Sequence, residues 1–293
     1  MIYLAGSIIL TSYLILAFKM LERLKLGVFQ AIVFNYITCT ITGSIFSGAF
    51  AGSSENIHSD WFPWACLMGI IFIVLYNVVG ITTQRIGASV AAVSYKVSLI
   101  IPVVFGIYLY NEKLQALQWA GIALALIAVI LTCLPNKQAE QKNKLHPVWL
   151  FVLPAILFFG SGLQDTLIKY IEQAYLNDYN KDAFLSCAFA AAALLGTIAL
   201  IVRLVRRQQI FNWKNVVAGT LIGVPNYFSI WCLVKYLQVS TLQSSAIIPI
   251  NNMGIVLLSA LAAWMLFKER LSTINRVGIF LSLVAILLIG LGS

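Results

Sequence analysis

Lys96 is the residue of this sequence best placed to do chemistry, because it is a basic side chain inside a long apolar run. It lies nine residues after Gly87 and fourteen before Tyr110. With a rise of about 1.5 Å per residue, this places it roughly 13 Å deep in a hydrocarbon layer about 30 Å thick. A charge there costs on the order of 3 kcal/mol or more. The ammonium is therefore expected to face a water-filled cavity, an anion or a substrate; a structural ion pair or a snorkelling side chain is the alternative.

Asp165 is the nearest acidic candidate to balance that charge. It lies in the apolar run 148–168, directly after Gln164 and four residues before Lys169. One interpretation is a local i to i+4 ion pair with Lys169 at the end of a helix. The other is a cavity carboxylate that pairs with Lys96 or carries a coupling proton. The sequence leaves both open.

Uncharged polar side chains also occur deep in the apolar runs. An amide in hydrocarbon must find a partner, either on another helix or in a ligand, so as a group these residues predict a polar cavity. Tyr95 projects about 100° away from Lys96 on a helix, so both can line one cavity only if it is broad. Asn35 belongs to the same group of deep amides. The candidate substrate-binding set is Lys96, Tyr95, Asn77, Asn226, Tyr227, Asn251, Asn252 and Gln164.

Two prolines and two glutamates stand at related places in the chain. Pro102 and Pro249 interrupt apolar runs, where a missing N–H frees a carbonyl and permits a bend. Each is a candidate hinge or a simple kink. Glu112 and Glu269 begin two further runs, where the helix dipole favours an acid, so capping is preferred over catalysis for them.

These residues sit in a chain too apolar for a soluble protein. It is 61% hydrophobic and 10% charged, with a mean hydropathy of +0.92. The first run lacks a preceding basic residue and a small-residue cleavage site, so we expect it to remain as a span. Runs of about 20 apolar residues predict ten transmembrane helices near 2–18, 28–50, 62–82, 87–110, 115–134, 148–168, 183–202, 215–234, 241–266 and 272–291.

The basic residues that produce the net charge of +9 lie mostly between these runs. Of 19 lysines and arginines, 14 fall at odd-numbered connections and four at even ones, and Lys96 lies within a run. Basic connections stay in the cytoplasm, so the pattern predicts that both termini face outward. We therefore expect a multi-pass protein of a bacterial cytoplasmic (inner) membrane, and nucleic acid is not an expected partner.

The chain repeats itself at about half its length. EKLQALQWAGIALALIAVIL begins at Glu112 and ERLSTINRVGIFLSLVAILL at Glu269; six of the eleven residues from Gly121 and Gly278 are identical, at an offset of 157. An odd number of spans per copy inverts the second copy in the membrane. The predicted domains are a first five-helix repeat (1–134), a polar linker (135–147) and a second, inverted five-helix repeat (148–293).

Several enzyme motifs are absent from the sequence. It contains no GxxxxGK[ST], HExxH or GxSxG, and its two histidines, His58 and His146, lie in connections. No catalytic residue, metal site or cofactor is therefore expected, and the protein is not expected to be an enzyme. The expected partners are a small-molecule substrate and membrane lipid, with the chain acting as a monomer or homodimer.

The phrases NEKLQALQWAGIALALIAVIL and KERLSTINRVGIFLSLVAILL, at the ends of two five-span halves, resemble the drug/metabolite transporter superfamily, specifically its EamA-like ten-helix members. The resemblance covers essentially the whole chain. It implies two inverted EamA repeats, a central cavity lined by helices one to four and six to nine, helices five and ten bracing the outside, and transport of amino acids, sugars or their derivatives.

Two features depart from that superfamily. Its members are generally described with both termini in the cytoplasm, and its small multidrug branch uses an acid in the first helix, which the first run here lacks. In having a lysine in its fourth run, the sequence is similar to the organic-phosphate and nucleotide-sugar branches of the superfamily, where basic residues hold anionic substrates. We expect a secondary transporter that moves a small polar or anionic metabolite by alternating access around Lys96, Asn77, Asn226 and Asn252; a lipid flippase or an integral-membrane enzyme is the alternative.

Overall fold

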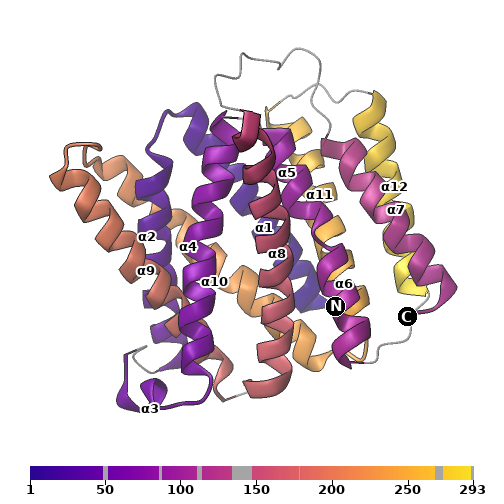
Figure 1. Cartoon of the computed structure of the whole chain (residues 1–293), viewed down its shortest axis with the longest axis horizontal. Helices are drawn as coiled ribbons and strands as arrows, with labels where there is room; N and C mark the ends of the chain where they lie inside the picture. The colour runs from indigo at the N-terminus through magenta and orange to yellow at the C-terminus, as the bar shows by residue number, and fades with distance from the viewer. Residues whose placement is uncertain are drawn as a thin grey trace. The chain divides into compact units, whose positions relative to one another are not determined.

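The computed structural model of the chain describes residues 1–48, 52–85, 88–110, 114–133, 147–177, 179–267 and 273–291, and the regular structure in these ranges is helical throughout. Glu112, Glu269 and linker residues 135–146 lie outside them. The helices are α1 (Ile2–Arg23), α2 (Val28–Ser47), α3 (Ser54–Ile57), α4 (Phe62–Arg85), α5 (Ala88–Val97), α6 (Ile100–Tyr110), α7 (Ala116–Cys133), α8 (Pro147–Tyr175), α9 (Lys181–Val205), α10 (Trp213–Val239), α11 (Ser244–Phe267) and α12 (Thr273–Leu291) (Figure 1).

The predicted all-helical membrane class is confirmed for these ranges. Within them, seven helices are long and apolar enough to cross a membrane: α1, α2, α4, α8, α9, α10 and α11. The three remaining apolar runs form shorter helical stretches, Ser94–Leu109, Ala116–Leu131 and Thr273–Ile289.

The fourth apolar run is broken immediately after Lys96. α5 ends at Val97 and α6 begins at Ile100. Pro102 explains the break, because it has no N–H to offer the carbonyl of Ser98 one turn earlier. That carbonyl accepts instead from Ile101 N at 2.9 Å, which tightens the turn. Pro102 therefore acts on the backbone next to the lysine.

The interpretation of Pro249 as a hinge or a simple kink stays a prediction. α11 continues through Pro249 without a break. Pro249 is the sixth residue of α11, so it removes a hydrogen bond near the helix start, where few such bonds exist to be lost. Of the two predicted interruptions, the structure shows a break in the helix only at the run that contains Pro102, among the residues that it describes.

The chain forms two compact units, and each combines residues from both predicted repeats. Unit 1 comprises Met1–Asn77 and Leu167–Gln238, and unit 2 comprises Val78–Thr166 and Val239–Ser293. α4 and α8 each contribute residues to both units. The repeats 1–134 and 148–293 stay a prediction about duplication, and neither compact unit coincides with one of them.

Small residues allow close helix packing in unit 1, where α2 packs along α9 and also contacts α10. A Cβ added to Gly219 of α10 would lie 2.5 Å from Ala31 O of α2, and one on Gly69 of α4 would lie 2.5 Å from Ala188 O of α9. Such contacts bring backbones together in a membrane, where no hydrophobic effect drives association between helices.

Replacing Gly219 with valine is expected to destabilise the protein by about 3 kcal/mol, because the new side chain would displace the backbone of α2. Thermal unfolding in detergent measures the effect. Gly80→Val is the matched control, since a Cβ there meets no described atom within 4 Å and the intrinsic helix cost of valine is the same. Equal losses of Tm in the two variants would contradict close packing at Gly219.

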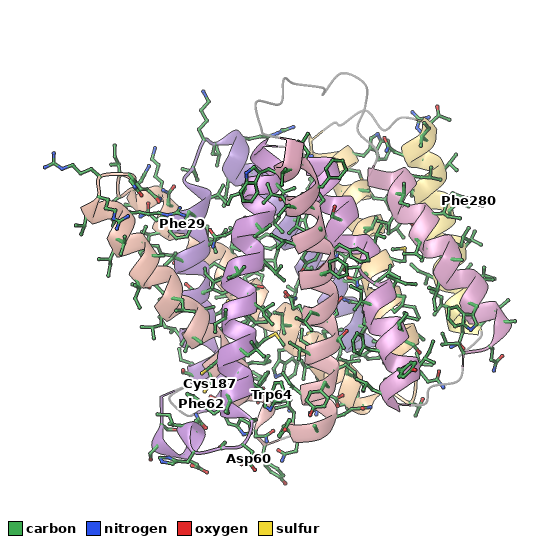
Figure 2. All side chains as sticks on the ribbon, viewed as in Figure 1. Phe29, Asp60, Phe62, Trp64, Cys187 and Phe280 are labelled. Carbon is green, nitrogen blue, oxygen red and sulfur yellow. The ribbon has the colours of Figure 1, made fainter. Side chains whose placement is uncertain are left out.

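Unit 2 is held by two sets of contacts. α7 and α12 lie side by side (Figure 1), with Gly121 packed against Ile289 and Asn275 Nδ2 donating to Leu131 O at 3.0 Å. Phe280 of α12 is 64% exposed and projects outward (Figure 2). α11 packs against α6, α7 and α12. α8 meets the start of α6 where a Cβ on Gly162 would lie 2.7 Å from Ile101 Cβ. These contacts bring the α5–α6 break, α8 and α11 together.

Candidate functional site

A chain of polar side chains joins three helices of unit 2. Lys96 Nζ of α5 donates to Asn252 Oδ1 of α11 at 2.9 Å. Asn252 Nδ2 in turn donates to Asp165 Oδ2 of α8 at 3.2 Å. Lys96 and Asn252 are each only 7% exposed, and Asp165 is half-buried. Two residues of the predicted substrate-binding set, Lys96 and Asn252, are thus brought together with Asp165, although all three are far apart in sequence.

The amide of Asn252 is oriented by its two charged neighbours. Its oxygen can only accept and its nitrogen can only donate, so a cation on one side and a carboxylate on the other fix which atom faces which. The opposite charges of Lys96 and Asp165 balance across this bridge, which lowers the cost of burying each of them. The arrangement is a neutral unit that an added anion or proton would unbalance.

The spacing of Asp165 and Lys169 would permit an ion pair between them, but each has another partner. Lys169 Nζ forms an ion pair with Glu172 Oε2 at 2.9 Å, and both side chains are buried. This pair belongs to unit 1, whereas the contact of Asp165 with Asn252 belongs to unit 2. Of the two interpretations of Asp165, the structure shows the contact that leads through Asn252 to Lys96.

Tyr95 lies closer to Lys96 than the helical projection suggested. The Lys96 ammonium is 5.2 Å from the centroid of the Tyr95 ring, within the range of a cation–π contact. The expected angle of about 100° describes the Cα–Cβ directions of adjacent helical residues. The long, flexible lysine side chain bends back towards the tyrosine ring, so the two groups meet although their Cα–Cβ bonds point in different directions.

Two serines support the helix break beside Lys96. Ser98 Oγ donates to Tyr95 O at 2.6 Å. Ser161 Oγ of α8 lies 2.7 Å from Ser98 Oγ and 2.6 Å from Leu157 O. Both serines are 1% exposed. Ser161 and Asp165 are one turn apart, so the same face of α8 contacts the break and the polar chain. This serine pair was not predicted from the sequence, where its indication is the four-residue spacing from Ser98 to Pro102.

Two buried hydrogen-bond acceptors belong to residues that directly precede Asp165 and Asn252 in the sequence. Gln164 precedes Asp165 and Asn251 precedes Asn252; they are 8% and 5% exposed. Gln164 Oε1 and Asn251 Oδ1 each lack a hydrogen-bond donor among the described residues. A buried acceptor without a donor costs about 1–3 kcal/mol. A bound molecule with N–H or O–H groups would relieve that cost.

The remaining predicted residues belong to unit 1. Asn226 Nδ2 of α10 donates to Asn35 Oδ1 of α2 at 3.1 Å, and both residues are buried. Asn77 Nδ2 donates within α4 to Ile73 O at 2.6 Å. Tyr227 packs against Phe189, with ring centroids 6.0 Å apart. Asn77, Asn226 and Tyr227 therefore lie in a different compact unit from Lys96 and Asn252.

Comparison with known proteins identifies the class of this arrangement. The model of the EamA-like transporter family matches residues 1–134. An uncharacterised protein of Haemophilus influenzae is 25% identical over 272 residues, which are 92% of this chain and 90% of that protein. A probable 4-amino-4-deoxy-L-arabinose-phosphoundecaprenol flippase subunit, ArnE of Pseudomonas syringae pv. syringae, is 32% identical over 82 residues, which are 28% of this chain and 71% of the subunit.

A solved crystal structure shares the fold. It superposes with a TM-score of 0.76 and 13% sequence identity, covering 99% of this chain and 96% of the other. This likeness concerns the fold alone. The family match, the ArnE relative and the apolar helices make the assignment: the chain is a multi-pass membrane transporter that belongs to the EamA-like transporter family of the drug/metabolite transporter superfamily.

Proposed function

We propose that this protein is a secondary transporter that moves a small polar or anionic metabolite across the bacterial cytoplasmic membrane by alternating access. In this proposal its apolar runs form ten transmembrane helices in two inverted five-helix repeats. The observation that carries it is the series of hydrogen bonds from Lys96 through Asn252 to Asp165, which joins a buried cation to a half-buried carboxylate next to a helix break. Intramembrane ionisable groups of this kind mark substrate and ion pathways.

The charges suggest how a substrate binds. While Asp165 is ionised, it balances Lys96 through the amide of Asn252. A proton on Asp165 removes the carboxylate charge on that side of Asn252, and an anionic group of the substrate then supplies a negative charge near the ammonium. Donor groups on the same substrate would satisfy Gln164 Oε1 and Asn251 Oδ1. The preferred substrate is an anion that also carries hydroxyl or amino groups, bound together with a proton.

The make-up of the units supports alternating access. Inverted-repeat transporters work by moving one bundle against another around a fixed site. Each compact unit here combines parts of both sequence copies, so a moving bundle would contain segments of both repeats. The α5–α6 break at Ser98, supported by Ser161, is a candidate hinge within unit 2. Pro102, which causes the break, is the hinge proline in this proposal, and Pro249 lies in a continuous helix.

Reconstitution in liposomes tests the proposal. Vesicles preloaded with one unlabelled small carboxylate or sugar phosphate should accumulate the same labelled solute by counterflow, with a rate that saturates as the solute concentration rises. Protein-free vesicles are the control. An ohmic, non-saturating current would contradict a carrier and indicate a channel; no counterflow with any amino acid, hydroxy acid or sugar phosphate would contradict the substrate class.

The similarity to a flippase subunit favours a second candidate, translocation of a lipid with a polar, charged head group. In that case Lys96 would contact a lipid phosphate. A dithionite assay with a fluorescent anionic lipid distinguishes the two, because a flippase exposes the labelled head group to the quencher while a metabolite carrier leaves the rate at that of empty vesicles.

A further inference from the structure

One end of unit 1 carries a concentration of positive charge. The α1–α2 and α9–α10 connections and the adjoining helix ends contain a single acidic residue, Glu22, whose side chain is outside the described part. Figure 2 places Phe29, at this end, opposite Asp60. The basic residues are Lys19, Arg23, Lys25, Arg203, Arg206, Arg207 and Lys214, and all but the partly exposed Lys19 are exposed.

An amide network joins the two connections. Asn215 Oδ1 accepts from Gly27 N at 3.0 Å, and Asn215 Nδ2 donates to Gln30 Oε1 at 2.8 Å. Gln30 Oε1 also accepts from Asn212 N at 3.2 Å, so its amide orientation is fixed by a backbone donor. Arg203 reaches across, with its guanidinium carbon 3.9 Å from the Phe29 ring centroid. The basic residues of both connections therefore share one surface.

The start of α2, at the centre of this surface, is rich in hydrogen-bond donors. Its N-cap, Gly27, provides no side-chain cap, and its first turn contains no acidic residue. Gln30 is fully buried, and its Nε2 has no hydrogen-bond partner among the described residues. Free N–H groups and the helix dipole at a helix start favour anions. The hydrogen-bond donors and the surrounding cations both favour a negatively charged ligand.

Two of the basic residues occupy a backbone conformation that usually requires glycine. Lys25 and Arg207 both have a φ of 54°, in the left-handed region. Each follows a helix end where a bond of the Schellman type spans it: Leu26 N to Leu21 O and Gln208 N to Arg203 O, both 2.9 Å. A non-glycine residue there costs on the order of a tenfold loss in the local folding equilibrium. Both positions carry a cation in place of the glycine that this conformation favours.

Exposed apolar side chains show where this surface lies. Ile210 is 87% exposed, Trp213 68% and Leu24 61%. Tryptophan and basic residues together are typical of the head-group layer of a membrane. We propose that the surface formed by the α1–α2 and α9–α10 connections binds the phosphate head group of an anionic phospholipid. The proposal is independent of the substrate site in unit 2.

The glycine variants Lys25→Gly and Arg207→Gly separate lipid binding from folding. The full-length double variant in phosphatidylcholine micelles should melt at or above the Tm of the parent, because glycine accepts the left-handed backbone. Adding phosphatidylglycerol should raise the Tm of the parent. To reach the same rise in Tm, the variant should need a phosphatidylglycerol concentration about fivefold higher for each basic residue removed. One basic residue near an anionic lipid surface raises the lipid affinity by about that factor. Lys25→Gln with Arg207→Gln repeats the test with the backbone strain kept.

Two controls define the result. Arg276→Gln removes an exposed arginine of α12 in unit 2 and should leave the response to phosphatidylglycerol unchanged. Soluble glycerol phosphate at the same phosphate concentration should not reproduce the shift. The proposal is overturned by an unchanged lipid response in both double variants, by an equal loss in Arg276→Gln, which indicates general attraction to charge, or by an equal shift with glycerol phosphate, which indicates a soluble anion.

Discussion

Replacing Lys96 with glutamine should reduce binding of the anionic substrate by about 2 kcal/mol or more, roughly thirtyfold, and reduce counterflow accordingly. Lys96 is 7% exposed and bonded to Asn252, so its charge is poorly screened by water. The variant should also melt earlier, because Asp165 loses its compensating charge. Substrate titration in detergent and counterflow in liposomes measure the first effect, and thermal unfolding measures the second.

A double variant separates folding from transport. Lys96→Gln with Asp165→Asn removes both charges and keeps amide groups that can bond to Asn252. Its Tm should recover towards that of the parent, since no unbalanced charge remains. Binding of the anion should stay low, because the cation is missing. If the double variant bound and transported the anion as well as the parent, Lys96 would have only a structural role.

Replacing Asp165 with asparagine alone should have the opposite effect on binding. Ionised Asp165 competes with the anionic substrate for Lys96, so in the parent the affinity should rise as the pH falls and Asp165 takes up a proton. In Asp165→Asn the affinity should be high and lose this dependence on pH. A pH gradient should then no longer drive accumulation, while exchange of substrate at equal pH continues. Titrations at several pH values and flux with and without a gradient measure both effects.

Glu172 provides the control for this experiment. It is the other buried acid of α8, and it is paired with Lys169 in unit 1. Glu172→Gln with Lys169→Gln removes that pair and should leave the pH dependence of binding as in the parent. If accumulation driven by a pH gradient survived in Asp165→Asn, another group would carry the proton.

Much of the fold could be predicted because the hydrophobic pattern dominates it. In the described ranges the long apolar runs are helical, apart from the break between α5 and α6, since a segment in hydrocarbon must satisfy its own backbone. Lys96 lies deep in one apolar run and Asp165 is an acidic residue within another, and these positions identified both ends of the hydrogen-bonded series. The physical reason is the same in each case: a charge in hydrocarbon is costly and therefore conspicuous in the sequence.

The partners of these residues could not be predicted in the same way. Asn251 and Asn252 are equivalent in sequence, and only the rotation of α11 against α5 and α8 decides that Asn252 forms the bridge. Lys169 is the cation nearest to Asp165 in the sequence, but Lys169 pairs with Glu172 instead. Ser98 and Ser161 are ordinary residues until packing places their hydroxyl groups together. Contacts between distant segments depend on helix rotation, which composition does not specify.

The contact between Lys96 and Asn252, which come from opposite halves of the sequence, has a consequence for biosynthesis. Lys96 and Asn252 are separated by 156 residues. While the ribosome is still producing the second copy, the ammonium of Lys96 has entered the membrane without the asparagine that later binds it. A nascent chain released after residue 134 would contain the whole segment matched by the family model, but none of the acceptors contributed by α8 and α11. The first copy is therefore not expected to be stable alone, and quality-control proteases should remove chains that end before α11.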